Sequence, residues 1–305
     1  MTAKEQVDYY LEYCKYRKEL DEKTLKAYRI DLKQYFDAVS CCDPGKEEID
    51  QFITDLHKKY KQKTIKRKIA SIRAYYNFLE EEERIGENPF RKVKVKFKED
   101  IILPRIIPRE EIERLLNFMY AYPSDLSDKE VKRRRRDQAV VEMLFATGAR
   151  VSEISNLKAD CVDLNSGLIR IMGKGAKERY IQIGEPEVLN LLKKYYTDNE
   201  KEIKACGYFF INQRNQRFTE QSIRGMIKKY ARQAGIERNI TPHMFRHSFA
   251  TYLIEEDVDI SCLQRILGHS SIRTTQIYIH VAARKQADIL RTKHPRNKMV
   301  IKIAA

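Results

Sequence analysis

The spacing of apolar positions over residues 7–90 is typical of helices. Apolar or aromatic side chains recur three or four residues apart, which gives each segment one hydrophobic face. This spacing occurs at Tyr10, Leu11 and Cys14, at Leu25, Tyr28 and Leu32, and at Ile72, Tyr75, Tyr76 and Leu79. The pattern predicts about four helices in this part of the chain.

Prolines interrupt the helical pattern at Pro89, Pro104 and Pro108. A helix is expected to end at Asn88, because a residue that precedes proline disfavours helical backbone. Beyond the prolines, the next helix is expected to begin at Glu110 or Glu111. We therefore predict a first domain over residues 1–98, a linker over residues 99–108 and a second domain over residues 109–305.

The second domain is mostly helical in pattern, with one exception near residue 170. Two apolar runs enclose a glycine-containing turn, in the order Leu168, Ile169 and Ile171, then Gly173, Lys174 and Gly175, then Tyr180, Ile181 and Ile183. Short runs of this kind on both sides of a turn are typical of a β-hairpin. Lys174 is expected at its tip. The predicted fold class is mainly α with a small antiparallel β-sheet.

The composition favours a polyanionic partner. The chain has 59 Lys and Arg against 44 Asp and Glu, a formal net charge of +15 and an isoelectric point near 9.4. Nucleic acid is the leading candidate for such a partner, and an acidic membrane surface is the alternative. No apolar stretch approaches the ~20 residues that span a bilayer, and none is typical of a signal peptide. We expect a soluble protein in the cytoplasm.

Cysteine and histidine spacing gives no indication of a metal site. The six cysteines include no C-x-x-C pair, and the six histidines include no H-E-x-x-H motif. The cysteines are therefore expected to be reduced thiols, and no metal is expected.

The second half of the first domain is the more basic one. Residues 1–50 carry more acidic than basic side chains, and residues 51–98 carry the reverse. The candidates for contacts with DNA phosphates in this run are Lys61, Lys63, Lys66, Arg67, Lys68 and Arg73. A charge run of this kind is as consistent with a solvated helix face as with phosphate binding.

Six side chains with catalytic potential follow one another in the second domain. They are Arg150 in TGARVSE, Lys174 in GKGAKER, His243 and Arg246 in HMFRHSFAT, and His269 and Tyr278 in LGHSSIRTTQIYIHV. Each motif alone is a weak signal, since an H-x-x-R pair is commonly just two neighbours on one helix face. Together, in this order, they resemble the signature of the tyrosine recombinase (phage integrase) family, and within it the short Xer-type members.

The resemblance covers almost the whole chain and implies an architecture. It implies an N-terminal helical, SAM-like core-binding domain and a mixed α/β catalytic domain that ends in an exchange segment, which docks on a neighbouring protomer. It also implies a double-stranded DNA core site with inverted repeats, and a homotetramer, or a heterotetramer with a related recombinase, on two such sites. No cofactor is implied. Integration, excision and dimer resolution remain open as outcomes, as does an origin in a mobile genetic element.

The resemblance also assigns roles that suit the residue types. Tyr278 attacks the scissile phosphate and forms a 3′-phosphotyrosine, and exchange proceeds through a Holliday junction without metal or ATP. Arg150 and Arg246 clamp the phosphate, because the planar guanidinium donates two hydrogen bonds and keeps its charge. The remaining members are Lys174 as the acid for the leaving 5′ oxygen, His243 as the candidate base and His269 as a further donor.

Three other positions have simpler interpretations. Glu153 follows Arg150 by three residues on a predicted helix and is interpreted as an orienting partner for a basic group. Ala149 and Phe245 depart from the residues usual at these positions of the family motifs, and we interpret both as packing positions.

The sequence bears on three alternative functions. A type IB topoisomerase shares the chemistry, but the match of the first domain to short recombinases argues against it. A DNA-binding regulator with a decayed site conflicts with the complete set of six residues. A metal-dependent nuclease lacks a recognisable ligand set.

Overall fold

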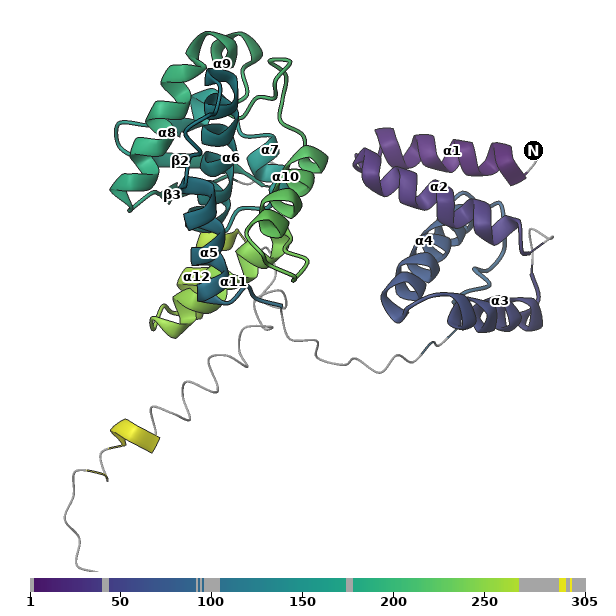
Figure 1. Cartoon of the computed structure of the whole chain (residues 1–305). Helices are drawn as coiled ribbons and strands as arrows, with labels where there is room; N and C mark the ends of the chain where they lie inside the picture. The colour runs from purple at the N-terminus through teal and green to yellow at the C-terminus, as the bar shows by residue number, and fades with distance from the viewer. Residues whose placement is uncertain are drawn as a thin grey trace, which may run out of the picture. The chain divides into compact units, whose positions relative to one another are not determined.

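The structure is a computed structural model that describes residues 3–39, 44–91, 93, 95, 105–173, 178–268, 291–294 and 297. The chain divides into two compact units, Met1–Asp100 and Ile101–Ala305 (Figure 1). Each unit has a hydrophobic core of its own.

The described part of the first unit consists of four helices, which confirms the number predicted from the periodicity. They are α1 (Ala3–Tyr16), α2 (Glu22–Phe36), α3 (Lys46–Lys59) and α4 (Gln62–Glu81). Helices α1, α2 and α4 pack against one another, and α3 packs against α4. Asp21 caps the start of α2, because its carboxylate accepts a hydrogen bond of 2.9 Å from the N–H of Thr24.

Aromatic side chains fill the core of the first unit. Those that are almost completely buried are Tyr10, Tyr35, Tyr75, Tyr76, Phe78 and Phe90. The rings of Tyr35 and Phe52 meet edge to face at 5.0 Å, and the hydroxyls of Tyr35 and Tyr76 lie 3.0 Å apart. This pairing matters because a buried hydroxyl without a partner is costly.

Helix α4 ends at Glu81, earlier than Asn88, where we predicted a helix end. Glu83 adopts left-handed backbone with φ of 55°, which prevents the helix from continuing. The chain then folds back on α4: the amide of Asn88 donates to Asn77 and accepts a hydrogen bond of 2.8 Å from the N–H of Phe90. The proline therefore marks the turn after the helix and not its last residue.

Helices also make up most of the described second unit. They are α5 (Arg109–Tyr120), α6 (Asp128–Thr147), α7 (Val151–Ser155), α8 (Pro186–Asp198), α9 (Glu200–Cys206), α10 (Glu220–Gln233), α11 (Pro242–Glu255) and α12 (Ile260–Leu267), with a 3-10 turn η1 (Ala159–Cys161). Helix α5 begins at Arg109, just before the predicted start, and carries Glu110 and Glu111 in its first turn. Ile107, inside the predicted linker, is already buried in this unit, and its N–H donates to Ser248 Oγ on α11 at 2.8 Å.

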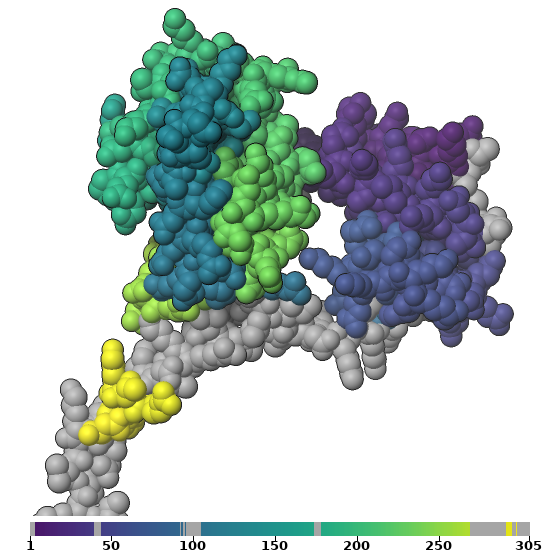
Figure 2. Space-filling view, viewed as in Figure 1, coloured from purple at the N-terminus to yellow at the C-terminus, as the bar shows by residue number. Residues whose placement is uncertain are grey.

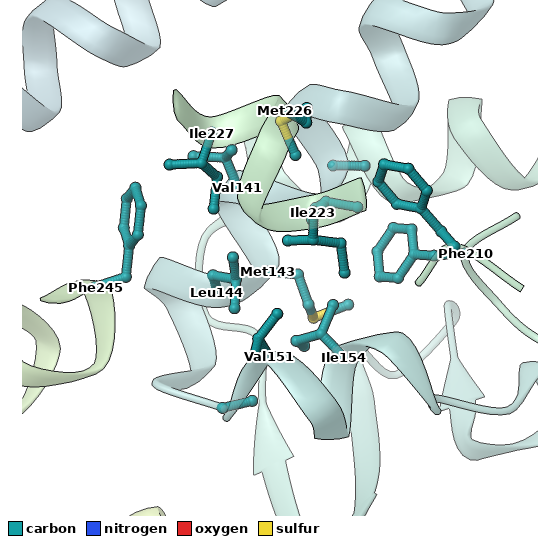
Figure 3. Packing of buried hydrophobic residues seen from close by; sticks show 14 of the residues in the cluster. Val141, Met143, Leu144, Val151, Ile154, Phe210, Ile223, Met226, Ile227 and Phe245 are labelled. Carbon is teal, nitrogen blue, oxygen red and sulfur yellow. The ribbon is translucent and has the colours of Figure 1, made fainter. Parts of the chain in front are cut away.

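Helix α6 is central to the second unit. It contacts α5, α7, α8, α10 and α11, and its residues 136–144 are buried all round. In the space-filling view the helices drawn in blue to teal and those drawn in green form one packed body (Figure 2). Figure 3 shows side chains of α6, α7 and α10 converging in the core, among them Val151 and Ile154 of the short helix α7. These two side chains anchor α7, and with it the residue at its start.

A three-stranded antiparallel sheet has the order β1 (Val162–Asp163), β2 (Leu168–Met172) and β3 (Glu178–Gln182). The pairing of β2 with β3 confirms the predicted hairpin, with Ile171 opposite Arg179. Its turn, including Lys174, lies outside the described residues. Alternation along the strands buries Ile169, Ile171 and Ile181 and exposes Leu168, Met172 and Tyr180.

Within the described ranges, each helix is too short or too polar to cross a membrane. The same ranges contain no group of three or more His, Cys, Asp or Glu that could hold a metal ion. The described cysteines, Cys14, Cys161, Cys206 and Cys262, are free thiols, as predicted for them.

Candidate active site

Arg150 lies in the sharp connection between α6 and α7. Gly148 ends α6 in left-handed backbone with φ of 56°, and Arg150 is the N-cap residue of α7. A Cβ atom at Gly148 would lie 2.4 Å from Cδ1 of Phe249, so only glycine fits there. Ala149 is completely buried, and so is Phe245 on α11. Both are therefore packing positions, as interpreted from the sequence.

Glu153 fixes Arg150 through both its backbone and its side chain. One carboxylate oxygen, Oε1, accepts a hydrogen bond of 2.7 Å from Arg150 Nη1, and Oε2 accepts one of 2.8 Å from the Arg150 N–H. This confirms the interpretation of Glu153 as an orienting partner. The Arg150 side chain remains 34% exposed, whereas that of Glu153 is 5% exposed. The arginine is therefore held in place and still accessible from solvent.

A second arginine, Arg179 on β3, binds the same carboxylate. Its Nη1 donates to Glu153 Oε1 at 3.1 Å and its Nη2 to Oε2 at 2.7 Å, and its side chain is 9% exposed. Burial raises the pKa of Glu153, but the hydrogen bonds and charges of Arg179 and Arg150 outweigh this effect and hold it below its ordinary value. Glu153 is therefore ionised near neutral pH.

The sequence analysis did not identify Arg179, although the sequence contains a signal for it. Arg179, Ile181 and Ile183 alternate along one strand, and the two isoleucines are buried. Arg179 lies on the buried, apolar face of this strand and pairs with the buried Ile171 on β2. A cation at such a position indicates a buried charge that needs a partner.

Arg246 is buried in α11 and joins two segments near the site. Its Nη1 donates to the carbonyl of Gly148 at 2.8 Å, and its Nη2 donates to the carbonyl of Leu267 at 2.7 Å. Leu267 is the last residue of α12, where helix carbonyls lack intrahelical partners. The arginine therefore ties the loop before Arg150 to the end of the helix that precedes His269.

His243 is exposed in the first turn of α11, one turn ahead of His247. The pKa of His247 is lowered by burial first, and then by the charges of His243 and Arg246. The two histidines and Arg246 therefore form one electrostatic group on α11.

A cleft of about 1290 Å³ has Arg150, Glu153, Arg179 and Arg265 among the described residues that line it. Gly173 and Gly268 also line the cleft, and they immediately precede Lys174 and His269 in the sequence. Lys174, His269 and Tyr278 themselves lie outside the described residues. The structure thus links two predicted site residues, because Arg246 binds the carbonyl of Gly148, two residues before Arg150. Two further predicted site residues, Lys174 and His269, directly follow residues that line the cleft.

The predicted DNA-contacting residues of the first unit fall into two groups. Lys61, Lys63 and Arg67 are exposed at the start of α4, and Lys66 is half-buried. Lys68 is 3% exposed, and Arg73 donates to the backbone carbonyl of Val93. Lys68 therefore offers no surface to a phosphate in this structure, contrary to the prediction. The helical period explains this, because Lys68 shares the core face of α4 with Ile65 and Ile72.

The partner of Lys68 is Asp31 on α2, whose side chain is completely buried. Lys68 Nζ lies 2.9 Å from Asp31 Oδ1, and Ser71 Oγ donates to Oδ2 at 2.9 Å. Arg67 and Gln34 complete this group as partners of Asp31 and Lys68 respectively. These residues join α2 to α4.

Two family patterns match the chain. The pattern of the phage integrase family matches residues 105–285, and that of the phage integrase N-terminal SAM-like domain matches residues 7–83. The chain therefore belongs to the phage integrase family. Together with the helical units and the small sheet, this confirms the predicted fold class.

Similar proteins indicate the activity more closely. The chain is 50% identical over 291 residues to a tyrosine recombinase of Agathobacter rectalis, a match that covers 94% of this chain and 95% of that protein. It is 33% identical over 302 residues to tyrosine recombinase XerD of Listeria monocytogenes, with 95% and 98% covered. The chain is thus an enzyme of the tyrosine recombinase class, which carries out site-specific DNA recombination.

A solved structure shows the same fold. It is the XerH site-specific recombinase bound to palindromic difH substrate in a post-cleavage complex, with a TM-score of 0.75 and 22% sequence identity. The match covers 92% of this chain and 83% of that chain.

Proposed function

We propose that this enzyme cleaves and rejoins duplex DNA through a 3′-phosphotyrosine formed by Tyr278, and that strands are exchanged through a Holliday junction without metal or ATP. The observation that carries the proposal is the setting of Arg150. A guanidinium fixed by Glu153 and still 34% exposed faces a cleft whose rim leads directly into the segments of Lys174 and His269.

Arg150 and Arg246 are the proposed cations of the site. Attack on a phosphodiester passes through a crowded species with additional negative charge, and fixed cations stabilise it without reorganising. Arg150 is oriented for this by Glu153, and Arg246 by the carbonyls of Gly148 and Leu267. The cost of ordering these side chains has been met during folding.

The remaining steps are proton transfers and the attack itself. The Tyr278 hydroxyl loses its proton, with His243 as the proposed base, and its oxygen bonds to phosphorus. The bond from phosphorus to the 5′ oxygen breaks, and Lys174 is the proposed acid that protonates that oxygen. His269 donates a hydrogen bond to the phosphate. Ligation reverses these steps, so the phosphotyrosine supplies the energy for rejoining.

The proposed partner is a DNA core site with inverted repeats. XerH was solved on a palindromic substrate, and a palindrome binds two copies of a protein by symmetry. Two such sites bring four copies together, as a homotetramer or with a related recombinase, and the C-terminal exchange segment is proposed to link neighbours. Integration, excision and dimer resolution use the same step. The proposed phosphate contacts of the first unit are the accessible Lys61, Lys63, Lys66 and Arg67.

The test uses a duplex selected from a random-sequence library by binding to the non-cleaving variant Tyr278→Phe. The selected duplex is nicked near the scissile phosphate, so that cleavage traps the covalent adduct on a denaturing gel. Wild-type protein is expected to form the adduct, and Tyr278→Phe is expected to bind the duplex equally well and form none. Tyr180→Phe serves as the matched comparison, because Tyr180 is an exposed tyrosine that lines the same cleft.

Two outcomes contradict the proposal. An adduct formed by Tyr278→Phe and lost in Tyr180→Phe identifies a different nucleophile. Wild-type protein that relaxes a supercoiled plasmid but never recombines two copies of the selected site is a topoisomerase and not a recombinase.

A further inference from the structure

The two arginines that bind Glu153 are exposed to very different extents. Arg150 keeps 34% of its side chain accessible, whereas Arg179 keeps 9% and donates two of its hydrogen bonds to the buried carboxylate. Each oxygen of Glu153 accepts one hydrogen bond from each arginine residue. Both arginines line the cleft, but Arg150 is the more accessible, and most of the Arg179 side chain is buried against Glu153.

The charge balance of this group depends on Arg179. Two guanidinium groups and one carboxylate leave one positive charge in excess, which is available to a phosphate in the cleft. Without Arg179, Arg150 and Glu153 would neutralise each other. Arg179 thus allows Glu153 to orient Arg150 without cancelling its charge.

Arg179 also contacts the end of α12. Gly268 adopts left-handed backbone with φ of 63°, and a Cβ atom there would lie 3.0 Å from Cδ and 3.1 Å from Nη1 of Arg179. Helix α12 and strand β3 are in contact as whole elements. Arg179 therefore joins the hairpin strand after Lys174, the start of α7 and the residue before His269.

We propose that Arg179 is a positioning residue for the cleavage step: it holds Glu153 so that Arg150 is aimed at the scissile phosphate and keeps its charge. The inference rests on the proposed function, because it presumes that Arg150 binds this phosphate. The role proposed for Arg179 acts through Glu153, to which both of its terminal nitrogens donate.

The first test measures the rate of adduct formation on the nicked selected duplex. Arg179→Met is expected to slow it about 100-fold, since displacement of a catalytic group by about 1 Å has effects of this size. Arg179→Lys restores one charge without the fork and is expected to be intermediate. The control is Arg170→Met on the neighbouring strand, because Arg170 pairs with the exposed Glu178 and is expected to leave the rate unchanged.

The second test separates positioning from general loss of structure by its pH dependence. The groups that face Glu153 are Arg150 and Arg179, and the cleft adds Glu178 and Arg265. Removing Arg179 leaves burial to raise the pKa of Glu153, and a protonated Glu153 no longer attracts Arg150. Protonation would also end the cancellation of the Arg150 charge, so the rate of Arg179→Met relative to wild type is expected to change between about pH 7 and pH 5. The double variant Arg179→Met/Glu153→Gln is expected to be no slower than the slower single variant and to lose this pH dependence.

Each result decides between defined alternatives. Equal rates for Arg179→Met and Arg170→Met reject the positioning role, as does a pH-independent ratio or full additivity in the double variant. If Arg179→Met does not bind the selected duplex because it fails to fold, Arg179→Lys is measured for the same pH dependence and the same coupling to Glu153→Gln. Absence of any adduct with wild-type protein rejects the proposed function, which is a separate outcome.

Discussion

The two arginines assigned to the phosphate reach their positions by different means. Arg150 is fixed by one carboxylate and is partly exposed, whereas Arg246 is 5% exposed and its guanidinium binds two backbone carbonyls. The same substitution should therefore have different consequences at the two positions.

Arg150→Lys and Arg246→Lys are both expected to slow adduct formation by about 100-fold or more. At Arg150 a bidentate donor becomes a point charge, and at Arg246 the loop before Arg150 also loses a bond that positions it. Only Arg246→Lys should also lower the thermal unfolding temperature by several degrees, because one ammonium cannot replace the two bonds to Gly148 and Leu267. Adduct assays combined with calorimetry check this. Equal stability of the two variants would contradict the structural role of Arg246.

At the scale of elements, the joint between α2 and α4 depends on one buried ion pair. Asp31 is completely buried and accepts from Lys68 and Ser71, as described above. Asp31→Asn leaves the buried ammonium of Lys68 without its carboxylate, whereas Lys68→Met leaves Asp31 paired with the half-exposed Arg67.

Asp31→Asn is expected to destabilise the first unit by about 3 to 5 kcal/mol, and Lys68→Met by less, because Asp31 keeps Arg67 and Ser71 as partners. Lys63→Met on the exposed side of α4 is the control and should change the free energy of unfolding by less than about 0.5 kcal/mol. Denaturant unfolding of the full chain measures both effects. The order of the variants should reverse when DNA binding by folded protein is measured. Lys63→Met should weaken binding and reduce its salt dependence more than the two variants at buried positions do.

The buried cations also show the limit of prediction from sequence. The number of helices in the first unit and the β2–β3 hairpin follow from local spacing, and both predictions are confirmed. The partners of Lys68 and Arg179 are Asp31 and Glu153, which are 37 and 26 residues away in the chain. A charge run counts every lysine as exposed, and only the fold reveals which cations face inward.

The prediction that a helix ends at Asn88 was wrong for a related reason. Helix α4 ends because Glu83 adopts left-handed backbone. Glycine is the usual residue in this conformation, so the sequence contains no signal for this helix end. For the candidate site, the sequence motifs predict Arg150, His243 and Arg246, and the interpretation of Glu153 as an orienting partner is confirmed. The bridging contacts of Arg246 depend on three segments meeting in space, which local patterns do not contain.

At the scale of the whole molecule, the C-terminal segment is predicted to act between protomers. Deleting the residues after Pro295 is expected to leave binding to a single selected site within about twofold of wild type, while pairing of two sites and recombination are impaired, because a head-to-tail contact can close a ring of four. Gel-shift and recombination assays on the same protein test this. Undiminished recombination argues against exchange between protomers, and so does binding that is lost in parallel.

The buried contacts of Arg246 also bear on how this enzyme would decay during evolution. A copy that lost Tyr278, the proposed nucleophile, would be released from selection for cleavage. Selection on Arg246 is expected to persist, since it binds the carbonyls of Gly148 and Leu267 and its loss would leave them without these donors. An inactive descendant is therefore expected to retain this arginine long after its activity has gone. Its presence in a genome sequence reports an intact architecture and says little about whether the DNA is still being cut.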